Sequence, residues 1–131
     1  MTEVLIKRLS KNIELPKYET NGSSGMDLSA NIEKQIKIEP GKTSIIPTGI
    51  SVSIPKNFEI QIRSRSGLAA KNQISVLNSP GTIDADYRGE LKVILINLSN
   101  KTFVVERGTR IAQMVLCLSL IHISEPTRLT M

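Results

Sequence analysis

Short runs of alternating apolar and polar residues cover most of the chain, and Pro or Gly interrupts them at close intervals. In Ile50–Ile54 the apolar residues alternate with serines, and in Phe58–Arg63 they alternate with charged or amide side chains. A period of two residues is typical of β-strands that bury one face. Similar runs predict further strands at Val4–Ile6, Met26–Leu28, Ile36–Ile38, Ser44–Ile46, Ile74–Leu77, Leu91–Ile96, Phe103–Val105 and Arg110–Leu116.

One segment, Ser66–Lys71, has the composition of a helix, and it is too short to be stable on its own. Many short strands with at most one short helix predict an all-β fold, a barrel or sandwich of antiparallel strands. The 131 residues suffice for one domain with a single core, and we find no internal repeat or linker.

The single cysteine, Cys117, excludes a disulfide within the chain and is compatible with a reducing cytosol. Met1–Leu9 is too short and too charged for a signal peptide. The nearly apolar run Met114–Ile123 has about ten residues, whereas a membrane span needs roughly twenty. We therefore expect a soluble cytoplasmic protein without a membrane partner.

A formal net charge of +5 invites a nucleic-acid ligand. However, the basic residues are scattered, and two Tyr, two Phe and no Trp offer little for base stacking. A positive charge suits a small polyanionic ligand equally well. We therefore expect no nucleic-acid partner.

Two carboxylates lie two residues apart in the segment Leu77–Ile96, which begins with turn formers and ends in an apolar strand. If this segment is a β-hairpin, Asp84 and Asp86 share one face near its tip, next to Tyr87. A solvated turn explains the same pattern. The local sequence leaves both interpretations open, although Asp86 is more typical of a turn former than of a second base.

A second polar segment, Arg63–Ala69, places two arginines, two serines and a glycine at the start of the short helical segment. Guanidinium groups, a hydroxyl and free backbone amides suit phosphate oxygens. A polar turn that needs Gly67 for backbone freedom explains the segment as well. The spacing excludes a Walker loop.

Four segments in order resemble the signature motifs of the trimeric dUTPases, the deoxyuridine triphosphate nucleotidohydrolases. They read Gly-Met-Asp-Leu at 25–28, Arg-Ser-Gly-Leu-Ala at 65–69, Gly-Thr-Ile-Asp-Ala-Asp-Tyr-Arg-Gly-Glu at 81–90 and Arg-Ile-Ala-Gln at 110–113. The resemblance covers about Leu5 to Cys117. It implies a jelly-roll-like subunit, a homotrimer with active sites between subunits, and Mg²⁺-dependent hydrolysis of dUTP to dUMP and pyrophosphate. This reaction removes dUTP from the nucleotide pool and supplies dUMP for thymidylate synthesis.

The resemblance also implies a role for each motif residue. Asp84 would position and deprotonate the attacking water, and Tyr87 would pack against the deoxyribose and leave no room for a 2′-hydroxyl. Asp27 would reach the magnesium ion through water, because the triphosphate holds most of that ion. The remaining substrate-binding residues would be those of the uracil site, Asn78, Thr82 and Ile83, and those of the phosphate site, Arg65, Ser66, Gly67 and Gln113.

The sequence departs from the family most clearly at its end. Ser64 stands where many dUTPases have Pro and Thr109 where many have Asp, and both differences are mild. Residues 118–131, in contrast, contain no Gly and no aromatic residue, whereas the family has a glycine-rich arm that closes over the nucleotide. We therefore expect a dUTPase-like domain at 1–117 and an unrelated tail at 118–131, such as a change of reading frame would leave. His122, the only histidine, lies in this tail and receives no role.

Loss of the arm predicts a pocket that binds nucleotide but turns it over slowly. A non-catalytic dUTP-binding or regulatory protein is therefore an alternative to an active dUTPase. A dCTP deaminase of the same fold is another alternative, but its site is centred on a glutamate and the segment around Asp84 resembles the hydrolase.

Overall fold

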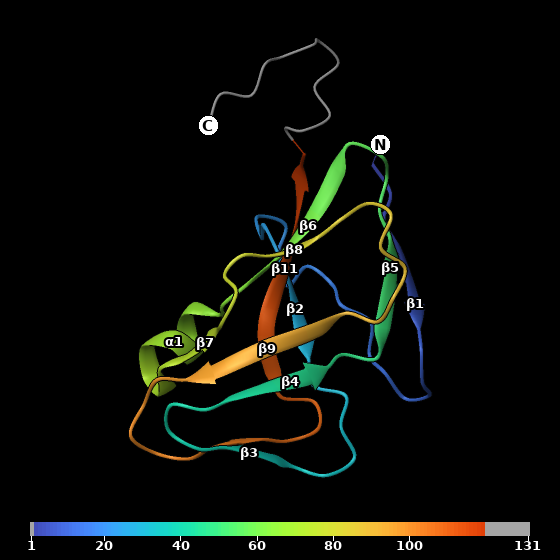
Figure 1. Ribbon diagram of the computed structural model, residues 1–131. Coiled ribbons are helices and arrows are strands. Elements are labelled where there is room, and N and C mark those ends of the chain that lie inside the picture. Colours follow the sequence, from blue (N-terminus) through green and yellow to red (C-terminus); the bar gives the residue numbers. More distant parts are fainter. Residues whose placement is uncertain (1, 120–131) are drawn as a thin grey trace, which may run out of the picture.

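The computed structural model describes residues 2–119, which contain eleven β-strands and one short helix (Figure 1). The elements are β1 (Leu5–Arg8), β2 (Met26–Ser29), β3 (Ile36–Ile38), β4 (Thr43–Pro47), β5 (Ile50–Ser53), β6 (Phe58–Arg63), α1 (Ser66–Asn72), β7 (Ile74–Val76), β8 (Gly81–Ile83), β9 (Lys92–Asn97), β10 (Phe103–Val105) and β11 (Arg110–Leu118). The predicted all-β fold with one short helix is confirmed.

Two larger sheets make up the body of the fold. The first has the strand order β2-β11-β6-β8 and the second β4-β9-β7, and the pairs β1-β5 and β10-β3 flank them. All of these pairings are antiparallel. In Figure 1 β9 and β4 cross β11 and β2, as expected for two layers of a jelly-roll-like sandwich.

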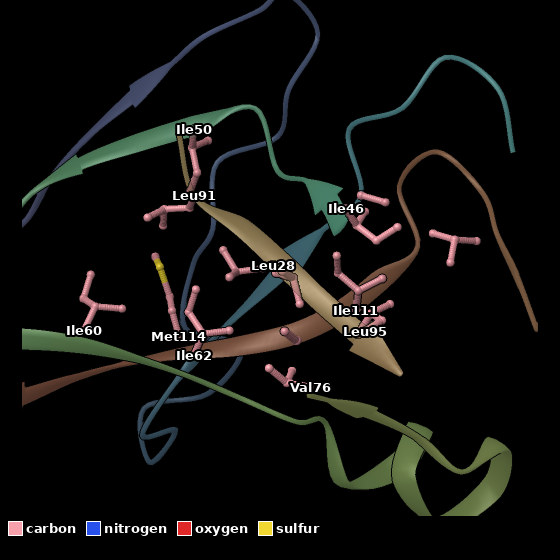
Figure 2. Close-up of a cluster of buried hydrophobic side chains, with 14 of the residues drawn as sticks. Leu28, Ile46, Ile50, Ile60, Ile62, Val76, Leu91, Leu95, Ile111 and Met114 are labelled. Atoms are coloured by element: carbon pink, nitrogen blue, oxygen red, sulfur yellow. The ribbon is translucent and has the colours of Figure 1, made fainter. Parts of the chain in front are cut away.

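The core lies between these two layers, because each strand directs alternate residues inward. In β6 Ile60 and Ile62 are buried, whereas Gln61 and Arg63 face the other side. Figure 2 shows side chains from both sheets meeting in one cluster, among them Leu28, Ile46, Ile62, Val76, Leu91, Leu95, Ile111 and Met114. Full burial of such a side chain stabilises the fold by about 1.5–3 kcal/mol. The period of two therefore predicted the inward face correctly.

The helix α1 connects β6 to β7 and contains no buried residue. It ends at Gln73, which adopts the left-handed conformation (φ 56°) and donates its backbone N–H to the carbonyl of Ala69. Partly buried Leu68 packs against the core. The adjoining strands thus hold a helical segment that is too short to be stable alone.

The hairpin considered for 77–96 is present at its ends, where β7 pairs with β9 and the N–H of Leu77 donates to the carbonyl of Ile94 at 2.8 Å, but its middle is not a two-stranded ribbon. The segment contains an additional strand, β8, which pairs with β6, whereas β9 pairs with β4 and β7. The connection from β8 to β9 therefore runs from one sheet to the other. The local pattern marks a strand but does not identify its partner, so the additional strand β8 and its pairing with β6 were not predicted.

No helix within residues 2–119 has the length and apolar character needed to cross a membrane.

Candidate active site

Asp27 and Gln113 lie opposite each other on the neighbouring strands β2 and β11, and Arg63 of β6 lies on the other side of Gln113. Residues directly opposite in an antiparallel pair project to the same face of the sheet. Leu28 and Met114, the next residues along the two strands, are buried in the core. Asp27 and Gln113 therefore occupy the outer face of the β2-β11-β6-β8 sheet.

Two guanidinium groups converge on the carboxylate of Asp27. Arg65 Nε lies 3.2 Å from Oδ1, and Arg110 Nη1 lies 3.5 Å from Oδ2. The side chain of Asp27 is only 14% exposed and that of Arg65 29%, so these pairs are partly shielded from water. Glu19 lies 3.8 Å from the outer nitrogen of Arg110. The carboxylate of Asp27 thus holds the guanidinium of Arg65 beside the sheet. Other N–H groups of that guanidinium can bind an anion.

A small hollow of about 50 Å³ lies beside β8 and β9. Asn78, Gly81, Thr82 and Ile83 line it. A Cβ on Gly81 would lie 3.2 Å from Nδ2 of Asn78, so the glycine lets this amide approach the strand. Apolar residues of both sheets, such as Ile62 and Val93, also line the hollow, and the amide of Asn78 can both donate and accept hydrogen bonds there.

Asp84 begins a turn directly after β8. The backbone N–H of Tyr87 donates to the carbonyl of Asp84 at 3.1 Å, and Asp84 and Asp86 are both exposed. Tyr87 Oη donates to the backbone carbonyl of Glu90 at 2.9 Å. In a turn the two carboxylates do not follow the alternation of a strand, so the shared face that we predicted for them does not apply.

The candidate residues form two groups on one sheet. In the β-register Gln113 lies opposite Arg63, and its neighbour Ile62 lies opposite Gly81. Adjacent strands are roughly 4.8 Å apart, so the Gln113 group and the Gly81 group are about 10 Å apart across the sheet. The structure thus brings Asp27, Arg65 and Gln113 together, and places Asn78, Thr82, Ile83 and the Asp84–Tyr87 turn in a second group. Ser66 and Gly67 are exposed at the start of α1, directly after Arg65.

Comparison with known proteins identifies the family. A model of the dUTPase family matches residues 11–130. The chain belongs to the dUTPase family. A protein of Rickettsia bellii (strain OSU 85-389), named deoxyuridine 5'-triphosphate nucleotidohydrolase, is 59% identical over 117 residues, which are 88% of this chain and 78% of that protein. A Chlamydia trachomatis (serovar D) protein of the same name is 59% identical over 108 residues, 82% of this chain and 74% of that one.

Solved structures of dUTPases share the fold. A dUTPase mutant of Staphylococcus bacteriophage 80alpha matches with a TM-score of 0.83 and 23% identity, covering 98% of this chain and 97% of that one. A second 80alpha mutant, studied with dUpNHpp, matches with a TM-score of 0.82 and 23% identity, over 100% of this chain and 97% of the other. A phage phi11 dUTPase that has a structural Mg(II) ion matches with a TM-score of 0.81 and 22% identity, over 98% of this chain and 96% of the other. These structures show the fold, whereas the family model and the relatives at 59% identity confirm the resemblance in the motifs as family membership.

Asp27 was predicted to reach a magnesium ion through water, and this stays a prediction. No group of three or more His, Cys, Asp or Glu side chains that could hold a metal ion occurs within residues 2–119. Both oxygens of Asp27 already pair with guanidinium groups. Proteins often hold Mg²⁺ through one or two carboxylates, water and the phosphates of a substrate. The donor set fits that form of magnesium binding and does not fit a cage made of protein ligands alone.

Several contacts at the site were not predicted. Arg110 pairs with Asp27, a partner that no local pattern identifies. Thr48 and Gly49, in the turn between β4 and β5, contact Glu90 and Leu91 beside Tyr87. The Pro-Thr-Gly sequence at 47–49 signals a turn, but no local pattern indicates what that turn contacts. His122 lies outside the described residues.

Ser64, which stands where many dUTPases have Pro, links the two groups of site residues. Its Oγ accepts the backbone N–H of Val76 at 2.9 Å and lies 2.9 Å from Oγ of Ser75. A weaker contact of 3.4 Å joins it to Ser79, next to Asn78. One hydroxyl therefore connects the segment between β6 and α1, which carries Arg65, to β7 and the loop that carries Asn78.

Ser64→Ala is expected to lower the free energy of unfolding by about 1–2 kcal/mol, because the N–H of buried Val76 loses its acceptor. Urea unfolding would measure the change. Ser66→Ala serves as the control, since Ser66 is exposed and its hydroxyl makes no hydrogen bond within the described residues. Equal stability of the two variants would contradict a structural role for Ser64.

Proposed function

We propose that this chain hydrolyses dUTP to dUMP and pyrophosphate. The observation that carries the proposal is 59% identity, over most of the chain, to proteins named deoxyuridine 5'-triphosphate nucleotidohydrolase. Two features support it: guanidinium groups gather on the outer face of the β2-β11-β6-β8 sheet, and the exposed carboxylate of Asp84 directly follows β8, which lines the hollow. These are the groups that a triphosphate, a base and an attacking water require.

Arg65, Ser66, Gly67 and Gln113 would bind the triphosphate. A triphosphate carries several negative charges that repel an incoming water unless cations and donors neutralise its oxygens. Arg65 is suited to this task because the Asp27 carboxylate, 3.2 Å away, holds its guanidinium in place before the substrate arrives. A group fixed in advance does not lose side-chain freedom when the phosphate binds.

Asp84 would orient and deprotonate the attacking water. A positioned carboxylate can orient a water and accept its proton as a general base. The water oxygen would form a bond to the α-phosphorus, the bond from that phosphorus to the bridging oxygen would break, and pyrophosphate would leave. The exposed position of Asp84 directly after β8 leaves this carboxylate accessible to a bound water.

Uracil would occupy the hollow beside β8. Asn78, Thr82 and Ile83 line that hollow, and the Asn78 amide and backbone groups of the other two would pair with the polar edge of the base. Discrimination against cytosine follows, because a wrong base would leave these groups without partners. Tyr87 would pack against the deoxyribose and exclude a 2′-hydroxyl.

Magnesium would bind mainly to the triphosphate, with Asp27 reaching it through water. The ion would neutralise charge on the phosphate oxygens. Asp27 would therefore serve both the ion and Arg65.

We also propose that the protein is a homotrimer whose active sites lie between subunits. The two groups of residues are about 10 Å apart within one subunit. The second group of a neighbouring subunit can lie closer to the first group, and this supports the proposal. A cytoplasmic location without membrane or nucleic-acid partners is supported by the single cysteine and the scattered basic residues.

The decisive experiment incubates the protein with Mg²⁺ and either dUTP or dCTP and identifies the products. The proposal expects pyrophosphate and dUMP from dUTP and no reaction with dCTP. Release of ammonia from dCTP would identify a deaminase instead. Binding of dUTP without turnover would identify a nucleotide-binding protein that is not a catalyst.

The dUTPase-like domain is proposed to end near residue 117, with 118–131 taking no part in closure over the nucleotide. Replacement of 118–131 by a glycine-rich arm with an arginine and an aromatic residue is then expected to raise kcat, because closure excludes water from the site. Single-turnover hydrolysis of dUTP would measure the gain. A serine-rich replacement of equal length is the control, and equal rates for the original and the glycine-rich chains would contradict the proposed boundary.

A further inference from the structure

The ring of Tyr87 is held by backbone groups of the residues that follow it. A Cβ on Gly89 would lie 2.5 Å from Oη and 2.7 Å from Cζ of Tyr87, so only glycine lets the ring occupy this position. Oη donates to the carbonyl oxygen of Glu90 at 2.9 Å. Because Tyr87 is 42% exposed, burial alone does not fix the ring. Its position therefore depends on that carbonyl.

The peptide unit that carries this carbonyl is fixed from its other side. The N–H of Leu91 belongs to the same peptide unit and donates to the carbonyl of Ile50 at 2.9 Å. In a planar trans peptide the N–H and C=O point in opposite directions, so this bond directs the Glu90 carbonyl outward, to Tyr87. Thr48, which is only 4% exposed, donates through Oγ1 to the next carbonyl, that of Leu91, at 2.6 Å.

The side chain of Glu90 forms the third link. Its Oε2 accepts the backbone N–H of Gly49 at 2.9 Å, in a partly buried contact between residues 41 apart in the sequence. The position of Gly49 is itself restricted, because its φ is +73° and a Cβ there would lie 2.2 Å from Cδ1 of Ile13. A carboxylate that accepts a backbone N–H makes a stronger bond than a neutral acceptor. The turn between β4 and β5 thus bonds to the side chain of Glu90 and to the backbone carbonyl of Leu91.

We propose that Glu90 is a positioning residue for sugar selection: its bond to Gly49 fixes the Tyr87 ring and thereby the discrimination between dUTP and UTP. This inference rests on the proposed function, in which Tyr87 packs against the deoxyribose. Glu90 touches no substrate in this scheme and acts only through Tyr87. A ring that shifts leaves space for a 2′-hydroxyl, so loss of the bond lowers selectivity for deoxyribose.

The test measures the KM of dUTP and the inhibition constant of UTP in dUTP hydrolysis, for the whole chain and its variants. Glu90→Ala is expected to lower the ratio of the UTP inhibition constant to the dUTP KM about tenfold. Glu90→Gln provides an amide oxygen that can accept the Gly49 N–H, so this variant is expected to retain most of the ratio of the original chain. Glu90→Asp keeps the charge but is one methylene shorter, and it is expected to lose selectivity as Glu90→Ala does.

A residue that merely stabilises the fold would give a different result. Glu39→Ala is the matched control, because Glu39 accepts a hydrogen bond from Thr102 at 2.9 Å at the end of β3 and its loss should leave the ratio unchanged. If Glu90→Ala fails to fold, Glu90→Asp carries the test. An unchanged ratio in a folded Glu90→Ala or Glu90→Asp chain overturns the inference alone, whereas absence of dUTP hydrolysis by the unaltered chain overturns both proposals.

Discussion

Asp84→Asn is expected to lower kcat for dUTP hydrolysis about 10²- to 10⁴-fold, because an amide cannot accept the proton of the attacking water. KM is expected to change little, since asparagine has nearly the same size and Asp84 is exposed after β8 rather than packed in the core. Steady-state release of pyrophosphate would measure both constants. A loss confined to kcat would be the mark of a group that acts in the chemical step.

Asp86→Asn is the matched control for this prediction. Asp86 lies two residues further along the same exposed turn and has the same charge. Its substitution is expected to leave kcat within a few fold of the original chain. A comparable loss in both variants would mean that the turn needs its charge or its shape, and would argue against Asp84 as the base.

Arg65→Ala is expected to lower kcat/KM about 10²- to 10³-fold, the cost of removing a charged donor from a transition state that gains charge. The guanidinium is held 3.2 Å from Asp27 and is only 29% exposed, so a water molecule is a poor substitute for it. Arg65→Lys is expected to recover little activity, because an ammonium group cannot bond both Asp27 and a phosphate with the planar fork of arginine. Kinetics with dUTP and Mg²⁺ would measure both variants.

Arg63→Ala is the control for Arg65. Arg63 is exposed at the end of β6, two residues before Arg65. Its guanidinium donates to Oε1 of Gln61 at 3.0 Å instead of to Asp27. Its loss is expected to change kcat/KM only a few fold, through the weaker positive field of the sheet. Equal losses for the two arginines would indicate a general effect of charge rather than a specific contact at Arg65.

The local sequence predicted the strands that bury one face. In β6 and β10 the predicted boundaries agree with the structure residue for residue, and most other strands differ by only one or two residues at an end. The reason is physical: alternate residues of a strand point to opposite sides, so burial of one face leaves a period of two in the sequence. The strand β8, Gly81–Ile83, was missed because Gly-Thr-Ile contains one large apolar residue and follows a run of turn formers, so it shows no alternation.

The ordered motifs predicted the family, and family membership is confirmed by the relatives at 59% identity. The roles of single residues stay predictions. Asp27, Arg65 and Gln113 were expected to serve one site, and the register of β2, β11 and β6 explains how segments far apart in the chain meet there.

The sequence by itself thus determined which residues face the core, the fold class and the family. Only the tertiary structure decided which strands pair, so it alone revealed that β8 and β9 belong to different sheets. It alone also revealed the pairing of Arg110 with Asp27 and the bond of Glu90 to Gly49. The physical reason is common to all three findings: periodicity records the side to which a residue points, whereas the partner that it meets depends on how distant segments pack.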